Sequence, residues 1–231
     1  MNTSDQVRIA LEELASSSLA RYRTAEDRIT AVVRDAVSAG VFLPGQRLPQ
    51  DTLASLLNVS RMPVRAALRR LESEGLVDLI PHRGALVRTL SRDEIQDLYE
   101  MRILIETYAL RKTVAAMTPR AFAELKELAE RMDMASTPSE WIQLRDDFYR
   151  KLYAIGNTPR VVKLIMQFRA EVGSHLKSVS HEGGNAHRPL LEYIEQSDPD
   201  LAASWLETHL REIAASLRSR FSASEETDAE S

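Results

Sequence analysis

The 231-residue sequence contains no cysteine, which excludes disulfide bonds and thiolate metal sites and fits a reducing compartment. It also has no run of about 18 apolar residues that could span a membrane. Its first residues lack the basic start and long apolar stretch of a secretory signal, so we expect a cytoplasmic protein. A nucleophile elbow, a glycine-rich phosphate loop and a closely spaced acidic pair are missing too, which argues against an enzyme.

Charge is distributed unevenly along the chain. The formal net charge is −4, yet residues 21–90 contain eleven Arg, no Lys and seven acidic residues, a net charge of +4. Residues 91–231 have a net charge of −6. A basic segment joined to an acidic one is expected of a protein that binds nucleic acid with one domain and performs a second task with another.

The basic segment has the pattern of three helices followed by a β-hairpin. Apolar residues at helical spacing predict helices over about 25–39, 51–57 and 61–74. The residues that follow them tolerate a left-handed backbone and end them: Gly40, Asn58 and Gly75. Ser60 is expected to cap the third helix. Two short strands are predicted at 77–80 and 85–89, on either side of a Pro-His-Arg-Gly turn.

The acidic segment has a helical pattern throughout. Ser91 and Glu94 have the spacing of a capping box. Four dipeptides place a capping residue before a proline, which marks helix starts: Thr118-Pro119, Thr137-Pro138, Thr158-Pro159 and Asp198-Pro199. With a break at Gly183-Gly184, these signals predict about six helices. The expected fold is therefore mainly α, an N-terminal winged helix-turn-helix with a small β-wing followed by an all-α bundle.

The helix predicted at 61–74 combines an apolar stripe with a basic ridge. The ridge residues, spaced by four, are Arg61, Arg65 and Arg69. A guanidinium can bond guanine through two hydrogen bonds or clamp a phosphate, so such a helix suits DNA. The alternative is a solvated face whose arginines pair with Glu72 and Glu74. The order of helix, turn, helix and hairpin favours DNA binding.

The segments that form the predicted helices and wing of the basic part resemble a known family. SRMPVRAALRRLESEGLV (60–77), LPGQRLPQDTLASLLNV (43–59) and the wing turn P-x-R-G closely resemble the GntR family of bacterial regulators. Residues 91–222 are similar to its FadR-like branch, whose helical effector domain is called FCD. The segments that resemble it are YEMRILIE (99–106), DDFYRKLYAIGNTPRV (146–161) and HRPLLEYIEQSD (187–198) with His209-Leu210.

The resemblance implies a homodimer bound to a palindromic DNA operator, with a ligand in the bundle changing the DNA affinity. It implies DNA contacts by Arg47, Ser60, Arg61, Arg65, Arg83 and Gly84. We add Arg69 of the ridge and His82 of the wing turn. The chain then divides into an arm (1–23) expected to be mobile, a DNA-binding domain (24–90), a ligand-sensing and dimerisation domain (91–222) and a tail (223–231) expected to be disordered.

Polar residues interrupt the apolar stripes of the bundle. Such positions predict a shared polar cavity, although a satisfied network such as Arg102 with Glu106 one turn on is the alternative. The candidate effector-binding residues are Arg102, Arg145, Tyr149, Arg169, His187 and His209.

The resemblance also bears on metal binding. The family often holds a metal in this cavity with one Asp and three His, and two of those His match His187 and His209. The other two positions contain Arg145 and Tyr149, and a guanidinium repels a cation. We therefore expect no tightly bound metal, with His187 and His209 as weak ligands at most. A cationic, donor-rich cluster instead suits a small anionic metabolite, with a carboxylate the expected group.

The function predicted from the sequence is a DNA-binding transcription regulator, expected to be a repressor, whose operator affinity responds to that metabolite. The alternatives are a metal-dependent hydrolase that uses His187 and His209, and a binding module without a DNA role. DNA binding must weaken steeply as salt rises, which distinguishes it from the second alternative.

Overall fold

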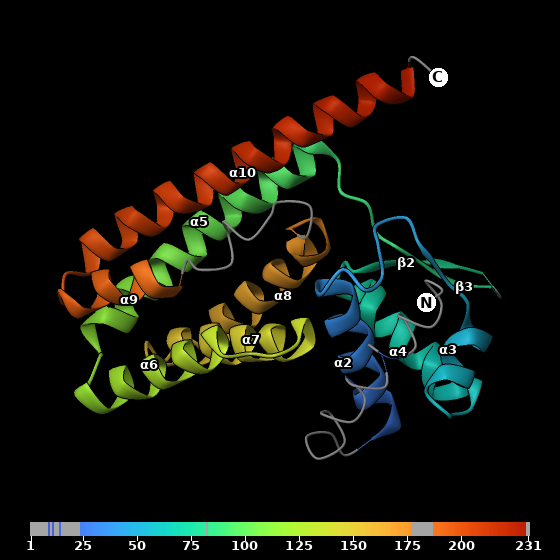
Figure 1. Ribbon diagram of the computed structural model, residues 1–231, viewed down its shortest axis with the longest axis horizontal. Coiled ribbons are helices and arrows are strands. Elements are labelled where there is room, and N and C mark those ends of the chain that lie inside the picture. The colour runs from blue at the N-terminus through green and yellow to red at the C-terminus, as the bar shows by residue number, and fades with distance from the viewer. Residues whose placement is uncertain are drawn as a thin grey trace. The chain divides into compact units, whose positions relative to one another are not determined.

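The computed structural model describes residues 9, 11, 14, 24–81, 83–176 and 187–229 (Figure 1). These residues form two compact units that divide near Thr89 and Leu90, with short stretches of two later helices grouped with the first unit. In the part of the chain that the structure describes, no helix is long and apolar enough to cross a membrane. The predicted fold class, a winged helix-turn-helix followed by a helical bundle, is confirmed.

The first unit contains helices α2 (Ala25–Ser38), α3 (Gln50–Leu56) and α4 (Arg61–Ser73). A three-stranded antiparallel sheet has the order β1 (Arg47–Leu48), β3 (Gly84–Val87), β2 (Val77–Ile80). The three helices and the β2–β3 hairpin match the predicted elements. Strand β1 was not predicted, because a strand of two residues has no alternation of apolar and polar residues to reveal it.

Local chemistry sets the helix ends of this unit. The Thr24 side chain accepts a hydrogen bond from the backbone N–H of Asp27 at 3.0 Å and so caps α2. Gly40, Asn58 and Gly75 have φ of 61°, 52° and 75°, the left-handed conformation predicted for the residues that follow the helices. The turn at Asn58 directs α4 across α3, which is the helix-turn-helix geometry.

The core of the first unit includes two residues of the N-terminal arm. Leu11 and Leu14 are 1% and 0% exposed and belong to the same apolar cluster as Val32, Leu53 and Leu68. The expectation of a mobile arm is therefore wrong at these two positions. Their spacing of three residues places both on one side of a helical turn, and burying two leucines stabilises the unit by about 3–6 kcal/mol.

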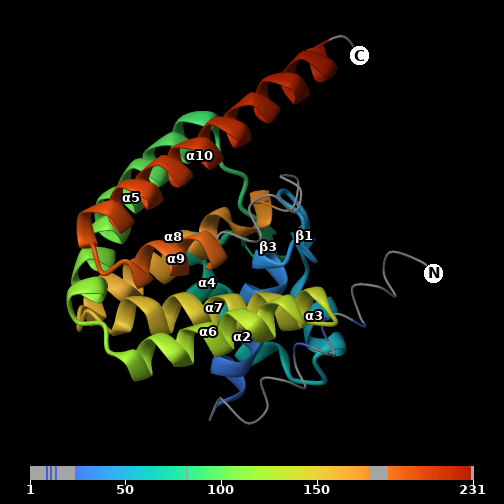
Figure 2. The same cartoon turned by 60° about the vertical axis from the view of Figure 1, so that its left-hand side comes forward.

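The second unit is a helical bundle. Its helices are α5 (Arg92–Ala115), α6 (Pro119–Asp133), α7 (Pro138–Ala154), α8 (Pro159–Leu176), α9 (His187–Glu195) and α10 (Pro199–Ala229). Helix α10 lies alongside α5 in both views (Figures 1 and 2). Arg111 Nε, near the end of α5, donates to Asp200 at the start of α10 at 2.7 Å, and Arg218, further along α10, donates to Gln96 near the start of α5 at 3.0 Å, so the two helices are antiparallel.

Most of the predicted helix starts in the bundle are confirmed. Ser91 and Glu94 form the full capping box. Thr118 and Thr137 each accept a hydrogen bond from a backbone N–H of the next turn, and Asp198 accepts two. Thr158 is different, because its hydroxyl is buried and has no hydrogen-bond partner among the described residues. The Gly183-Gly184 break lies outside the described residues.

The C-terminal tail also differs from expectation. Residues 223–229, expected to be disordered, continue α10 to Ala229. They contain neither Gly nor Pro, and Ala and Glu favour helix. Adding residues to an existing helix needs no new nucleation, so acidic composition alone did not end it.

Candidate functional site

Helix α4 separates its apolar and basic residues cleanly. Its buried residues are Val64, Ala67, Leu68 and Leu71, each 0% exposed, as the apolar stripe predicts. Arg61, Arg65 and Arg69 are exposed on the other side. Because the stripe anchors the helix, the guanidiniums are presented to solvent at fixed positions.

The acidic residues near the ridge are engaged elsewhere. Glu74 binds Arg34 and Arg70 at 2.7 and 3.5 Å, and Glu72 accepts from the backbone N–H of Leu79 at 3.3 Å. Within the described residues Arg65 and Arg69 have no ion pair or hydrogen bond. The alternative of a ridge paired with Glu72 and Glu74 is therefore not what the structure contains.

Arg61 differs from the other two ridge arginines. Its Nε lies 2.5 Å from the carboxylate of Asp51, and both side chains are more than half exposed. Such a surface ion pair stabilises by at most about 1 kcal/mol, so a phosphate or base can displace it.

The N-terminus of α4 lies beside this pair. Ser60 occupies the N-cap position with an extended backbone, but its side chain makes no capping hydrogen bond, contrary to expectation. Ser60 lines a shallow surface groove together with Asn58, Val59 and the Arg61–Asp51 pair. Uncapped backbone N–H groups and the positive end of a helix suit an anionic oxygen.

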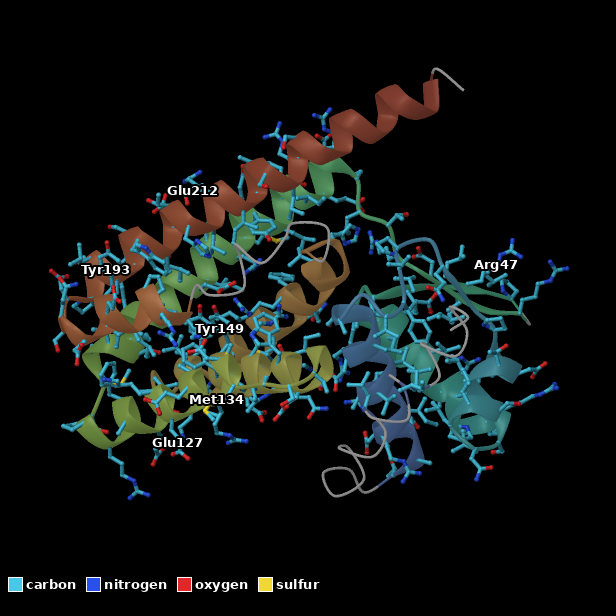
Figure 3. The ribbon with its side chains drawn as sticks, viewed as in Figure 1. Arg47, Glu127, Met134, Tyr149, Tyr193 and Glu212 are labelled. Atoms are coloured by element: carbon cyan, nitrogen blue, oxygen red, sulfur yellow. The ribbon has the colours of Figure 1, made fainter. Side chains whose placement is uncertain are left out.

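The wing lies next to the ridge. A second groove is lined by Arg65 and Arg69 of α4 and by Leu79, Ile80, Pro81 and Gly84 of the hairpin, with Gln50. Arg47 on β1 is exposed and points away from the sheet (Figure 3). Arg83 at the turn is exposed too, and neither arginine has an ion pair in the described part of the chain. His82 lies outside the described residues. The exposed arginines of α4, β1 and the wing turn thus belong to one small domain.

Gly84 shapes the wing. Its φ is 118°, and a Cβ atom there would lie 2.2 Å from the carbonyl oxygen of Leu48. Glycine adopts a positive φ without strain, and the close approach of β1 is a second reason for a residue without Cβ here. Because Gly84 is buried, its role is to let β1 pair with β3, and the exposed atoms at the turn belong to Arg83.

In the helical unit, Glu106 is the centre of a buried polar cluster. Its carboxylate accepts from Arg102 Nε at 2.7 Å, from the Tyr153 hydroxyl at 2.7 Å and from Arg169 Nη1 at 3.2 Å. Glu106 and Tyr153 are fully buried, and Arg102 is 3% exposed. Arg102 is therefore satisfied by Glu106 one turn on, as the alternative for this residue expected.

The charges of this cluster perturb one another. Burial raises the pKa of Glu106, but the charges of Arg102 and Arg169 outweigh it, so the pKa lies below its usual value. Burial raises the pKa of Tyr153 well above its usual value, and the Glu106 carboxylate adds to this. Glu106 is therefore ionised and Tyr153 neutral, and the hydroxyl donates.

Tyr149 and Arg145 extend the cluster along α7. The Arg169 guanidinium lies 3.3 Å from the centre of the Tyr149 ring, a cation–π contact inside the bundle. Burial, joined by the charges of Arg169 and Arg102, lowers the pKa of Arg145. Asp146 partly offsets this from 3.7 Å. Among these named residues, three guanidiniums face two carboxylates, so the group has a net charge of +1.

The two candidate histidines lie at different edges of the cluster. His187 is 1% exposed; its Nε2 is 3.1 Å from Asp133, and its Nδ1 has no partner among the described residues. His209 stacks on Trp205 with ring centres 5.1 Å apart. Burial, with Arg102 and Arg169, lowers the pKa of His209 despite nearby Glu212, so the ring is neutral at pH 7.

This donor set does not fit the metal that the family often holds. Across the described ranges no three His, Asp or Glu side chains come together as a metal site. The resemblance places Arg145 where the family has a carboxylate ligand, and the charges of Arg102 and Arg169 act on that position. Asp133 and Tyr153 were missed as partners from the sequence, because they lie 54 and 47 residues away from His187 and Glu106.

Comparisons with known proteins agree with this architecture. A model described as "Bacterial regulatory proteins, gntR family" matches residues 25–87, and an FCD domain model matches residues 97–212. The Nta operon transcriptional regulator of Aminobacter aminovorans is 26% identical over 178 residues, which cover 74% of this chain and 83% of that protein. The HTH-type transcriptional regulator McbR of Escherichia coli is 29% identical over 174 residues, 74% of this chain and 78% of that protein.

A solved structure shows the same fold. The structure of E. coli McbR/YncC has a TM-score of 0.76 and 23% identity, and the match covers 87% of this chain and all of that one. The hydrolase alternative finds no support, because the matched families and relatives are transcription regulators. This chain belongs to the gntR family of bacterial regulatory proteins, in the branch with an FCD domain, and is a DNA-binding transcription regulator.

Proposed function

We propose that this regulator inserts α4 into the major groove of a palindromic operator while the wing contacts the minor groove. The observation that carries the proposal is the ridge of Arg65 and Arg69, exposed and without acidic partners in the described chain. Arg61, Arg69 and the N-terminus of α4 bind phosphates or bases, and Arg65 bonds a base edge. Arg83 and Arg47 contribute from the wing side.

The test of DNA binding is its dependence on salt. An operator is first selected from random duplexes with the full chain, and its affinity is measured from 50 to 200 mM salt. A protein that neutralises several phosphates loses affinity steeply over this range, with a log–log slope of about −0.9 per contact. An affinity indifferent to salt contradicts the proposal and favours a module that binds protein.

We further propose that the chain acts as a homodimer through the helical domain. An apolar stripe on α5 supports this: Met101, Leu104 and Tyr108 share one face and are 40%, 70% and 49% exposed. Leu104→Glu should convert a dimer into a monomer in sedimentation velocity. Met134→Glu is the matched control, because Met134 is equally exposed on the helical unit but lies off α5. An unchanged dimer in Leu104→Glu places the interface elsewhere.

The effector is proposed to be a small anion bound at the arginine cluster without a tight metal, with binding that lowers operator affinity. The net charge of +1 among the named arginines and carboxylates supports a singly charged carboxylate, as does the Nε of buried Arg169, which has no hydrogen-bond partner among the described residues. The protein is dialysed against chelator and its melting temperature is measured with monocarboxylates, dicarboxylates and phosphate esters. Monocarboxylates should raise the melting temperature more than the other two classes do. Stoichiometric metal that survives chelation, detected by elemental analysis, contradicts the metal-free site.

A further inference from the structure

One apolar side chain stands among the arginines of α4. Met62 is 76% exposed, whereas the other large apolar residues of this helix, Val64, Leu68 and Leu71, are completely buried. A single exposed apolar residue is ordinary on a protein surface. What makes Met62 informative is its position.

Met62 lies on the same face as the basic ridge. At 100° per residue it is about 60° around the helix from Arg65 and about 20° from Arg69. It is the second residue of α4, immediately after Arg61. The first turn of a recognition helix is the part that enters deepest and meets the base edges.

The chemistry of the groove limits what Met62 can recognise. A thioether on an unbranched chain donates no hydrogen bond and accepts only weakly, so it gains little from phosphates or from polar base edges. The C5-methyl group of thymine is the apolar feature that a base pair presents in the major groove. Contact with it would remove both groups from water, while the flanking guanidiniums bind polar partners.

We propose that Met62 is a specificity-determining residue that contacts a thymine methyl group in each operator half. This inference rests on the proposed docking of α4 in the major groove. It adds to that docking a base identity and a residue that reads it without hydrogen bonds. Because Met62 is exposed, changing it should leave the fold intact.

The test combines a substitution in the protein with the removal of one methyl group from the DNA. Each thymine of the selected operator is replaced in turn by deoxyuridine, which differs only by that methyl. For the unaltered protein, replacing one particular thymine in a half-site should lower the affinity for the operator about fourfold, which corresponds to the burial of one methyl group. Met62→Ala should bind the unmodified operator more weakly and show no further loss at that thymine.

Controls separate the inference from the docking on which it rests. Met134→Ala removes an equally exposed methionine from the helical unit and should reproduce the deoxyuridine profile of the unaltered protein. Met62→Leu should keep most of the thymine preference. If tight, salt-dependent binding is indifferent to every thymine methyl, or if Met62→Ala keeps the full loss at the same thymine, the inference is overturned while the docking stands. Failure to select any operator would overturn the docking itself.

Discussion

Glu106→Gln removes one negative charge from the interior of the bundle and keeps the shape of the side chain. Glutamine keeps one acceptor oxygen, so it can accept at the position that bonds Arg102 or at the position that bonds Tyr153 and Arg169, but not at both. It also removes one of the two carboxylates that face the three guanidiniums of the cluster. Removing one partner of a buried ion pair costs about 3–5 kcal/mol, because the remaining charge stays buried without compensation. For a protein of this size, such a loss corresponds to a fall of roughly 6–20 °C in melting temperature.

The assay is thermal unfolding followed by tryptophan fluorescence, since Trp141 and Trp205 lie on α7 and α10. Glu100→Gln is the matched control: it removes a charge from the same helix, but Glu100 is exposed and bonded only to Gln96 in the described chain. The control should leave the midpoint nearly unchanged. A fall of less than about 2 °C in Glu106→Gln would refute the reasoning, because the guanidiniums would then not depend on this carboxylate.

The pH dependence provides a second readout of the same charge. The pKa of Glu106 is lower in the folded protein than its usual 4.5. Its contribution to stability is therefore fully present above about pH 4.5 and is lost as the pH falls through the folded pKa. In Glu106→Gln the stability should vary less over that acidic window. Equal slopes for the two proteins would show that Glu106 is not ionised inside the bundle.

Three further predictions follow from the geometry. Gly84→Ala should destabilise the winged-helix unit, because positive φ alone costs about 1–3 kcal/mol and the overlap of the new Cβ with Leu48 adds to it. An unchanged unfolding midpoint would mean that β1 can move away. Arg65→Ala should weaken operator binding by about 1–3 kcal/mol and relax sequence preference in gel-shift titrations at fixed salt, whereas unchanged affinity would remove it from the base contacts. Arg145→Ala should abolish the rise in melting temperature caused by a bound monocarboxylate while sparing DNA affinity; a retained rise would place the ligand elsewhere.

Local signals in the sequence predicted the elements of this protein well. Helix ends at Asn58 and Gly75 and the capping box of Ser91 depend on neighbours within a few residues, which the sequence contains directly. Ser60 and Thr158 occupy predicted cap positions without making the bond. Residue type favours a cap, but the rotamer depends on what surrounds the side chain in three dimensions.

The partners of the buried polar residues could be predicted only where they were local. Arg102 and Glu106 are one turn apart, so their pairing was foreseeable. The bonds from Tyr153 and Arg169 to Glu106 span 47 and 63 residues. Helical periodicity tells which side of each helix is buried but not which helices face one another, so one sequence cannot supply such contacts.

Strand β1 has a consequence for how this regulator measures DNA. It precedes the helix-turn-helix in the chain, yet it pairs with β3 of the wing, and its backbone crosses within reach of Gly84. Strand β3 therefore contacts both β1 and α4, so in the proposed docking the fold itself sets the distance between the major-groove contacts of α4 and the minor-groove contacts of the wing. A base pair inserted inside the stretch that one copy covers should be tolerated poorly. In the proposed dimer, a ligand that changes DNA affinity would then act on the distance between the two DNA-binding domains, since the geometry within each domain is set by its own sheet.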